Sequence, residues 1–326
     1  MGGADGILKT LEVRAAGVSR VLEALLSEDR DLLGEISLYS FYGGGKRLRP
    51  VVFSLAWELL GGKTDDLVLR GASVFELVHM ASLLHDDIVD SSDTRRGRRA
   101  AHLEFGIPEA VLAGDYLVAK ASRLALEWRN MDVFGLLTDV LRELSYGELY
   151  QLKARRDPEL SRDGYYDIIR RKTAALLSAS AETPAALLSA PPESRDALRG
   201  FGERYGTAFQ IADDVLDYCG EPGALGKPVL RDLDEGRVTL PLILARDTLP
   251  PAKATRLKVL ARMPERTDLE RAEVLDLVRE GGGVESARAE AAGWAREAAR
   301  VLDRFPAGPA ADLLRSLALL NAERER

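Results

Sequence analysis

The sequence predicts an all-α protein. Leucine and alanine are abundant, apolar residues recur at spacings of three and four, and alternating β-branched runs are scarce. Hydrophobic residues make up 46% of the chain and charged residues 30%, as in ordinary globular proteins. We find no linker long enough to divide the 326 residues, so residues 1–326 are expected to form one domain.

Helical periodicity, interrupted by glycine and proline, gives the expected elements in order. Pro50 and Pro108 suit the first turns of the helices that follow them. Pro184 should end or kink its helix, because it lacks an N–H and crowds Ser180. A polar loop is expected over 91–99 and a glycine-rich, charged loop over 220–237. The expected helical segments are 7–26, 51–60, 65–90, 109–128, 131–153, 164–188 and 193–218. A short apolar segment follows at 239–245, and three or four smaller amphipathic helices are expected over 251–326.

Composition excludes several classes of protein. Because 45 basic and 52 acidic residues give a net charge of −7, nucleic acid is not the expected partner. Cys219 is the only cysteine, which excludes an intramolecular disulfide and a thiolate metal cluster. The three histidines, His79, His85 and His102, are too few to favour a histidine-rich zinc site. The start does not resemble a signal peptide, and no run of about 18 uncharged apolar residues indicates a membrane span, so a cytoplasmic location is expected.

Two acidic motifs are the main chemical signal. Asp86 and Asp90 lie on one face of the predicted helix, with Asp87 turned away, and like charges at this spacing destabilise a helix. The same spacing recurs at Asp213-Asp214 and Asp217. Oxygen ligands suit Mg²⁺, which takes one or two carboxylates together with substrate phosphates. A single copy would usually be a solvated helix end, whereas two copies predict a pair of facing metal sites.

Basic residues near the predicted helix starts indicate anion binding. The run Gly43-Gly44-Gly45-Lys46-Arg47-Leu48-Arg49-Pro50 places flexible backbone and cations beside a helix N-terminus, although a surface basic cluster is the alternative. It lacks the spacing of a P-loop. Glu76-Leu77-Val78-His79 has the spacing of a di-iron ligand pair, but no second copy is present. His79 is therefore either a donor to an anion or a core histidine.

These motifs resemble those of the trans-isoprenyl diphosphate synthase family. Residues 76–90 with Arg95-Arg96-Gly97 resemble its first aspartate-rich region. The further landmarks follow in the family order: 44–50, Gly114-Asp115-Tyr116-Leu117, Gly147-Glu148 with Gln151, Lys172-Thr173, 209–217 and 232–241. The resemblance covers about residues 40–245. It implies the isoprenoid synthase fold, a single-domain bundle of long, mostly antiparallel helices around a central cavity.

The resemblance also implies a role for each matching residue. Mg²⁺, three ions per active site with substrate bound, would be held by Asp86, Asp87, Asp90, Asp213, Asp214 and Asp217. The allylic diphosphate would be neutralised by Arg95, Lys172 and Lys227, and isopentenyl diphosphate would be held by Lys46, Arg49, His79 and Arg96. Arg237 replaces the usual lysine of the family, so its charge is kept but its geometry changes. Thr173 and Gln210 would lie beside the allylic carbon.

The implied reaction is ionisation, condensation and elimination. Cations stabilise the departing diphosphate, and isopentenyl diphosphate attacks the allylic cation of a geranyl, farnesyl or geranylgeranyl primer. The released diphosphate can take the proton that is lost, and apolar helix faces exclude water.

Residues before Asp86 set product length in this family. A bulky aromatic residue four or five positions earlier would stop growth, but this chain has Ala81 and Ser82 there, with Val78 and Leu77 one turn further back. One helical turn rises about 5.4 Å, on the order of one isoprene unit. A medium or long product is expected, hexaprenyl to octaprenyl diphosphate, with geranylgeranyl diphosphate as the alternative.

Rival interpretations make different demands on the sequence. A terpene cyclase usually lacks the second aspartate motif, and a non-catalytic subunit of a two-component prenyl synthase loses aspartates or basic ligands that this chain keeps. Helices 110–126 and 131–149 are apolar on most faces, which suits a homodimer, the usual state of the family.

Overall fold

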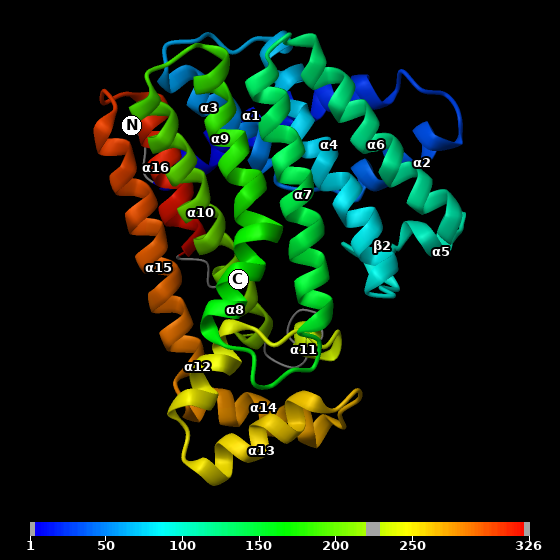
Figure 1. The fold of residues 1–326 in the computed structure, drawn as a ribbon, viewed down its shortest axis with the longest axis vertical. Helices are drawn as coiled ribbons and strands as arrows, with labels where there is room; N and C mark the ends of the chain where they lie inside the picture. The colour runs from blue at the N-terminus through cyan, green and yellow to red at the C-terminus, as the bar shows by residue number, and fades with distance from the viewer. Residues whose placement is uncertain (1–3, 220–228, 323–326) are drawn as a thin grey trace. The chain divides into compact units, whose positions relative to one another are not determined.

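The computed structural model describes residues 4–219 and 229–322, and helices dominate throughout (Figure 1). Within these residues the strands are one antiparallel pair, β1 (Thr94–Arg95) and β2 (Arg98–Arg99). The all-α prediction is confirmed. The α-helices are α1 (Ala4–Leu26), α2 (Leu32–Tyr42), α3 (Leu48–Leu59), α4 (Asp66–Val89), α5 (Ala101–Phe105), α6 (Ile107–Glu127), α7 (Met131–Lys153), α8 (Arg162–Ile169), α9 (Ala175–Leu187), α10 (Pro192–Cys219), α11 (Arg231–Asp234), α12 (Leu240–Thr248), α13 (Pro251–Arg262), α14 (Asp268–Glu280), α15 (Gly283–Val301) and α16 (Pro309–Ala322). A π-helical turn, η1 (Arg170–Ala174), joins α8 to α9. A 3-10 turn, η2 (Leu302–Arg304), follows α15.

The long helices agree closely with their predicted ranges. α7 has the predicted bounds, and α4 differs from the predicted 65–90 by one residue at each end. The N-terminus of α4 is defined by Asp65, whose side chain accepts a 2.9 Å hydrogen bond from the Val68 N–H. Such a cap satisfies a backbone donor that the helix itself leaves without a partner.

The predicted helix 164–188 is three consecutive segments, α8, η1 and α9. The expectation that Pro184 could end this helix is wrong, because α9 continues to Leu187. Pro184 cannot donate to the Ser180 carbonyl, but its own carbonyl still accepts from the Leu188 N–H at 3.0 Å, so the helical turn continues past it. Beside it, the buried Thr183 hydroxyl donates to the Ala179 carbonyl at 2.7 Å, so a side chain contributes a donor near the missing N–H.

The polar loop predicted over 91–99 contains a β-hairpin, with Thr94 opposite Arg99 and Arg95 opposite Arg98. Its two central residues, Arg96 and Gly97, both have positive φ (52° and 78°). Two left-handed central residues match the twist of a tight hairpin. The hairpin therefore presents consecutive arginines on a fixed turn.

The chain forms two compact units. The first contains Met1–Leu141, Leu176–Gly202 and Leu302–Leu314, and the second contains Arg142–Ala175, Glu203–Val301 and Arg315–Arg326. α7 and α10 each contribute residues to both units. Each unit is described by itself below.

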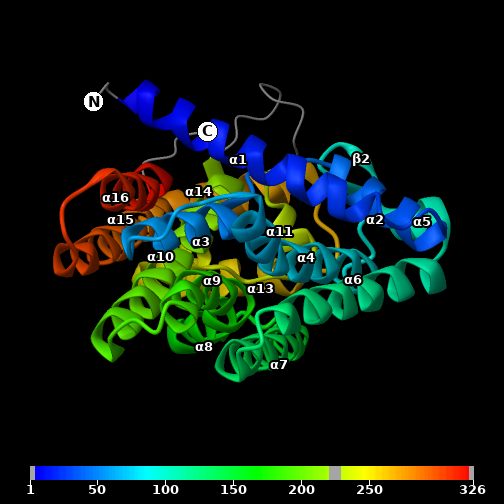
Figure 2. The ribbon, with the colours of Figure 1, turned by 90° about the horizontal axis from the view of Figure 1, so that it is seen from above.

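In the first unit, α4 is the central helix and packs against α6, α3 and α1 (Figures 1 and 2). By length and composition α4 could cross a membrane, but 61% of its apolar window is buried inside the protein, as in a core helix. Gly71 of α4 lies against the Trp128 ring, and Trp128 stacks on Phe53 of α3 with ring centroids 5.7 Å apart. A glycine thus permits the close approach on which this aromatic contact depends.

In the second unit, α12 packs against α13, α14, α15 and α8 (Figure 1). Its buried residues Leu240, Leu242 and Ile243 join Leu257 and Leu260 of α13 in one apolar cluster. Ile211 and Val215 of α10 belong to the same cluster. The core therefore fixes the part of α10 that carries the second aspartate motif.

Gly71→Ala tests the α4 packing. An added Cβ would lie 2.0 Å from a Trp128 ring carbon, so we expect the free energy of unfolding to fall by about 1–3 kcal/mol. Gly17→Ala on α1 is the matched control, because its Cβ would lie 3.8 Å from Leu69, and helix propensity should then stabilise the protein by about 0.5–1 kcal/mol. Denaturant unfolding measures both; equal effects of the two substitutions would contradict this packing.

Candidate active site

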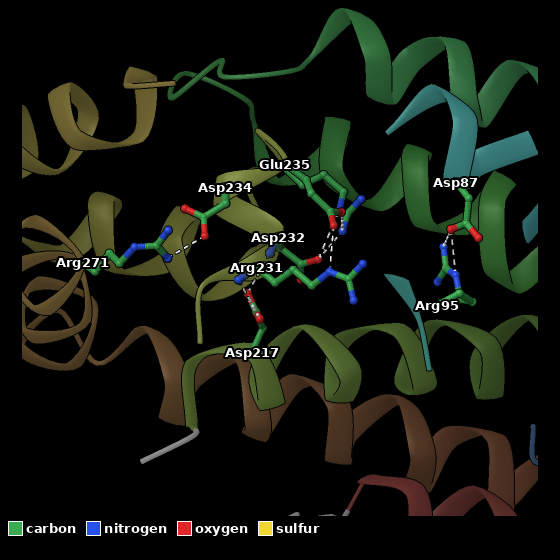
Figure 3. A network of polar contacts seen from close by, with 9 residues as sticks. Asp87, Arg95, Asp217, Arg231, Asp232, Asp234, Glu235 and Arg271 are labelled. Carbon is green, nitrogen blue, oxygen red and sulfur yellow. Dashed lines mark hydrogen bonds and ion pairs between the residues drawn. The ribbon is translucent and has the colours of Figure 1, made fainter. Parts of the chain in front are cut away.

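The first aspartate motif lies at the C-terminal end of α4. Asp86 and Asp90 are half-buried, and the Asp90 N–H donates to the Asp86 carbonyl at 2.8 Å, which closes the last turn. Asp87 is buried and accepts hydrogen bonds from the Arg95 guanidinium, at 2.8 Å from Nε and closer from Nη2 (Figure 3). Arg95 of the hairpin thus neutralises the aspartate that faces inward.

A buried ion pair anchors the basic segment before α3. Arg47 Nη1 donates to Glu76 Oε1 of α4 at 3.0 Å, and Nη2 donates to the Phe41 carbonyl at 2.9 Å. Arg47 and Glu76 are only 5% and 2% exposed, and the guanidinium lies over the Phe41 ring at 4.5 Å. This pair was missed in the sequence, where Glu76 was considered only as an iron ligand. Two features of the sequence could have indicated the pair: a glutamate in the otherwise apolar α4 and an arginine in a glycine-rich run.

Glycine brings the basic segment close to the hairpin. Gly45 has φ of +146°, and an added Cβ would lie 2.8 Å from Arg96 Nη1 and 3.3 Å from Arg47 Nη1. Ser180 Oγ donates to the Arg49 carbonyl at 2.6 Å, which fixes the backbone on the other side of Arg47. A pocket adjoins this cluster, lined by Tyr39, Ser40, Gly43, Leu83, Leu84, Asp87, Arg95, Arg96, Arg98, Arg99 and Ala101. Its cations suit an anionic ligand.

His79 lies within the same positive field. Burial, together with the charges of Arg49, Arg96, Arg95 and Arg47, holds the pKa of His79 well below its usual value. The imidazole is therefore neutral at pH 7 and offers one N–H donor rather than a charge. Its part in holding an anion stays a prediction, now as a neutral hydrogen-bonding group.

The second aspartate motif belongs to a series of hydrogen-bonded polar side chains on η1 and α10. Thr173 Oγ1 donates to Gln210 Oε1 at 2.7 Å, and Gln210 Nε2 donates to Asp214 Oδ1 at 2.8 Å. Thr173 and Gln210 were expected together beside the allylic carbon and Asp214 was expected as a metal ligand; the structure joins all three by hydrogen bonds. Asp214 is 4% exposed and also accepts a 2.6 Å hydrogen bond from Tyr165, a residue that was not predicted. Burial, followed by the charge of Asp232, raises the pKa of Asp214 well above its usual value.

Asp217 connects α10 to the segment that carries α11. Its two carboxylate oxygens accept the N–H groups of Arg231 and Asp232, each at 3.0 Å (Figure 3). Burial and the charge of Asp232 raise the pKa of Asp217 to about 7, against the opposing effect of these two hydrogen bonds. Arg237 donates to Asp232 at 2.8 Å and also pairs with Glu235. Arg237 therefore lies within an acidic cluster.

The remaining predicted residues have varied surroundings. Lys172 of η1 pairs closely with the half-buried Glu148 of α7. Lys46 is exposed. Lys227 lies outside the described residues. Of the chain-length positions, Leu77, Val78 and Ala81 are buried in α4, and Ser82 is half-buried with its hydroxyl bonded to the His79 carbonyl at 2.9 Å.

The carboxylates fit a hard divalent cation. Asp86 and Asp90 share one helix face, and burial together with the charge of Asp232 raises the pKa of both Asp214 and Asp217. Among the residues that the structure describes, three or more His, Cys, Asp or Glu side chains do not come together as a ready-made metal site. This suits Mg²⁺, which takes few protein ligands and completes its shell with water and substrate phosphates.

The chain is similar to known proteins of one family over most of its length. The pattern of the family described as polyprenyl synthetase matches residues 30–278. The octaprenyl diphosphate synthase of Haemophilus influenzae is 35% identical over 322 residues, covering 98% of this chain and 97% of that protein. Heptaprenyl diphosphate synthase component 2 of Geobacillus stearothermophilus is 34% identical over 311 residues, covering 95% of each chain. A polyprenyl synthase of Caulobacter crescentus, solved with calcium and isoprenyl diphosphate, has a TM-score of 0.90 at 35% identity over 100% of this chain and 99% of that one.

Glu76→Gln tests the buried ion pair. Losing the carboxylate would leave the Arg47 guanidinium buried without its anion, so we expect the free energy of unfolding to fall by about 3–5 kcal/mol. Glu58→Gln is the matched control, since its pair with Arg14 is about one quarter exposed, and it should cost less than about 1 kcal/mol. Denaturant unfolding separates them. Similar losses in both variants would show that the Arg47 pair has no special weight.

His79→Gln tests the neutral imidazole through pH dependence. In the unfolded chain His79 takes up a proton below about pH 6.5, whereas in the folded protein its lowered pKa keeps it neutral. The unfolded state therefore binds more protons as pH falls, and the folded protein loses stability. Between pH 7.5 and 5.5 this loss should be about 1 kcal/mol smaller in His79→Gln than in the wild type, measured by denaturant unfolding. An unchanged loss would mean that His79 titrates normally.

Proposed function

Because the chain belongs to the polyprenyl synthetase family, we propose that it extends an allylic diphosphate with isopentenyl diphosphate to hexaprenyl, heptaprenyl or octaprenyl diphosphate. It is a prenyltransferase, an all-trans polyprenyl diphosphate synthase of the medium- or long-chain kind. The observation that carries the proposal is the same in both units. Each holds an aspartate motif with a cationic side chain nearby: Arg95 pairs with Asp87 in the first, and the charge of Arg237 acts on Asp217 in the second.

We assign the metal contacts to the six aspartates of the two motifs. Asp86 and Asp90 of α4 and Asp213 of α10 would hold Mg²⁺ directly. Asp87, Asp214 and Asp217 accept hydrogen bonds from the protein and would contribute through their remaining lone pairs or by holding their neighbours in place. When bound, Mg²⁺, three ions per site, supplies positive charge that stabilises the leaving diphosphate.

The cationic residues divide into two groups in this proposal. Arg95, Lys172 and Lys227 would bind the allylic diphosphate, and Arg237, which pairs with Asp232, would add a further cation to substrate binding. Lys46, Arg49, Arg96 and the neutral His79 would bind isopentenyl diphosphate. The Arg47–Glu76 pair fixes the backbone of the segment that carries Lys46 and Arg49. Because the two charges of the pair neutralise each other, Arg47 does not bind the ligand in this proposal.

In this proposal, side-chain dipoles rather than charged groups stabilise the positive charge that develops on the allylic carbon. Thr173 and Gln210 are held in a fixed hydrogen-bonded pair, so their oxygen dipoles need no reorganisation when positive charge develops on the allylic carbon. The double bond of isopentenyl diphosphate attacks this carbon, and the proton lost afterwards can pass to the released diphosphate. No protein base is required.

Product length is proposed from the small residues of α4. Ala81 and Ser82 precede Asp86, with Val78 and Leu77 a turn earlier, and none is large enough to close a path along the helix. Relatives named octaprenyl and heptaprenyl diphosphate synthases support a long product. A geranylgeranyl pyrophosphate synthetase of Pyrococcus horikoshii, 28% identical with a TM-score of 0.90, keeps the shorter product as the alternative.

Assembly and location complete the proposal. The relatives cover the chain almost end to end, which supports one domain over residues 1–326. Apolar side chains of α6 and α7 are exposed in each unit, which suits a homodimer: Leu112, Leu126 and Met131 in the first and Tyr146 and Leu149 in the second. We place the protein in the cytoplasm. A relative named as a component of heptaprenyl diphosphate synthase makes a two-component enzyme, in which this chain would be one subunit, the second alternative.

The direct experiment incubates the purified chain with farnesyl diphosphate, labelled isopentenyl diphosphate and Mg²⁺. Mass spectrometry should find hexaprenyl to octaprenyl diphosphate. A product that stops at geranylgeranyl diphosphate would favour the alternative. No turnover by the isolated chain with any primer would overturn a self-sufficient synthase and favour a two-component enzyme.

Ala81→Phe tests the path along α4. A phenyl ring at this buried position should shorten the main product by one or more isoprene units while the enzyme still turns over. Ala56→Phe on α3 is the control for overpacking, since Ala56 is equally buried. Mass spectrometry of both product mixtures decides. Unchanged length in Ala81→Phe, or equal shortening in both variants, would mean that growth does not pass Ala81.

A further inference from the structure

Tyr165 is a buried polar residue that the roles above do not use. It lies on α8, is 3% exposed, and donates its phenolic hydrogen to Asp214 Oδ2 at 2.6 Å. A buried hydroxyl–carboxylate contact is among the stronger hydrogen bonds of a protein, and losing one partner leaves the other without compensation. Tyr165 is 49 positions from Asp214 in the chain, so sequence spacing does not reveal the contact.

The contact determines which way Gln210 faces. Tyr165 occupies Oδ2 of Asp214, so Oδ1 is the oxygen that accepts from the Gln210 amide nitrogen, at 2.8 Å. The Gln210 carbonyl oxygen must then point the other way, where it accepts from Thr173 Oγ1 at 2.7 Å. The hydrogen bonds therefore converge on Asp214. Thr173 donates to Gln210 and Gln210 donates to Asp214 on one side, and Tyr165 donates to Asp214 on the other.

We propose that Tyr165 is a positioning residue for the reaction, acting through Asp214 to orient Gln210 and Thr173 toward the allylic carbon. The inference rests on the proposed function, in which those two residues face the developing charge. Without the phenolic hydroxyl, one oxygen of Asp214 loses its donor and the carboxylate can rotate. Gln210 can then turn its amide, and the Thr173 hydroxyl loses its fixed acceptor. Preorganised dipoles of this kind matter chiefly in the transition state.

The next residue supplies a matched control. Tyr166 is also on α8, and its hydroxyl accepts from Trp294 Nε1 at 3.3 Å and pairs closely with Glu290. Tyr166→Phe also removes a phenolic hydroxyl from a carboxylate partner. That partner, Glu290, is not hydrogen-bonded to Gln210 or Thr173. A general effect of losing a tyrosine hydroxyl should appear in both variants.

The experiment compares Tyr165→Phe and Tyr166→Phe with the wild type. In Tyr165→Phe, kcat should fall by about tenfold or more while KM for each substrate stays within about threefold, the pattern of an interaction made in the transition state. Calorimetric binding of inorganic pyrophosphate with Mg²⁺ should be unchanged. Tyr166→Phe should keep kcat within about twofold. Equal kcat values in the two variants, or a loss confined to KM, would overturn the proposal.

Two further measurements exclude a packing effect. Tyr165→4-aminophenylalanine keeps a donor at the para position and should restore most of kcat, whereas a packing defect would not be restored. In a double-mutant cycle with Thr173→Val, the two losses in kcat should overlap rather than multiply; multiplied losses would overturn the proposal. Wild-type turnover is measured first. Its absence would refute the proposed function, while an active wild type with an unaffected Tyr165→Phe refutes only the role of Tyr165.

Discussion

Charge compensation among poorly solvated side chains is the constraint on which this structure depends. Glu76 offsets Arg47, Arg95 offsets Asp87, and Arg237 offsets Asp232. A buried charge without a partner is strongly destabilising, so each pair limits how its helix can be placed. Burial, followed by the charge of Asp232, raises the pKa of Asp217 to about 7, so the protein holds this carboxylate where its charge is poorly solvated. Mg²⁺ and diphosphate groups are proposed to complete the charge compensation.

The two acidic motifs are organised alike, although each belongs to a different unit. In the first, Asp87 is buried against Arg95 while Asp86 and Asp90 are half-buried on the helix end. In the second, Asp214 is buried among hydrogen-bond donors and Asp217 holds the N-terminus of α11. A motif that looks like three equivalent ligands thus contains residues with separate tasks. Asp87 and Asp217 hold neighbouring segments of the protein, and metal binding by the motifs stays a proposal.

Much of the fold could be predicted because its signals are local. The ranges of α4 and α7 follow from apolar periodicity, and Asp65 marks the start of α4 three residues before the N–H that it caps. The hairpin around Arg96, the π turn at Lys172 and the contacts of Arg47 and Tyr165 were not predicted. Arg47 and Tyr165 meet partners 29 and 49 positions away, and such pairing leaves no periodic pattern in the sequence. Residue type identified candidate ligands; the folded chain revealed which of them already have partners.

The central claim is that Mg²⁺ and diphosphate bind cooperatively, with the aspartates holding the metal and the cationic side chains holding the diphosphate. Thermal unfolding with Mg²⁺ alone, inorganic pyrophosphate alone, and both together tests it most directly. Ligands that bind the folded state raise the melting temperature by mass action. The two together should raise it well beyond the sum of their separate effects, and Asp213→Asn should remove that excess. An equal rise from pyrophosphate with a chelator present would contradict the claim.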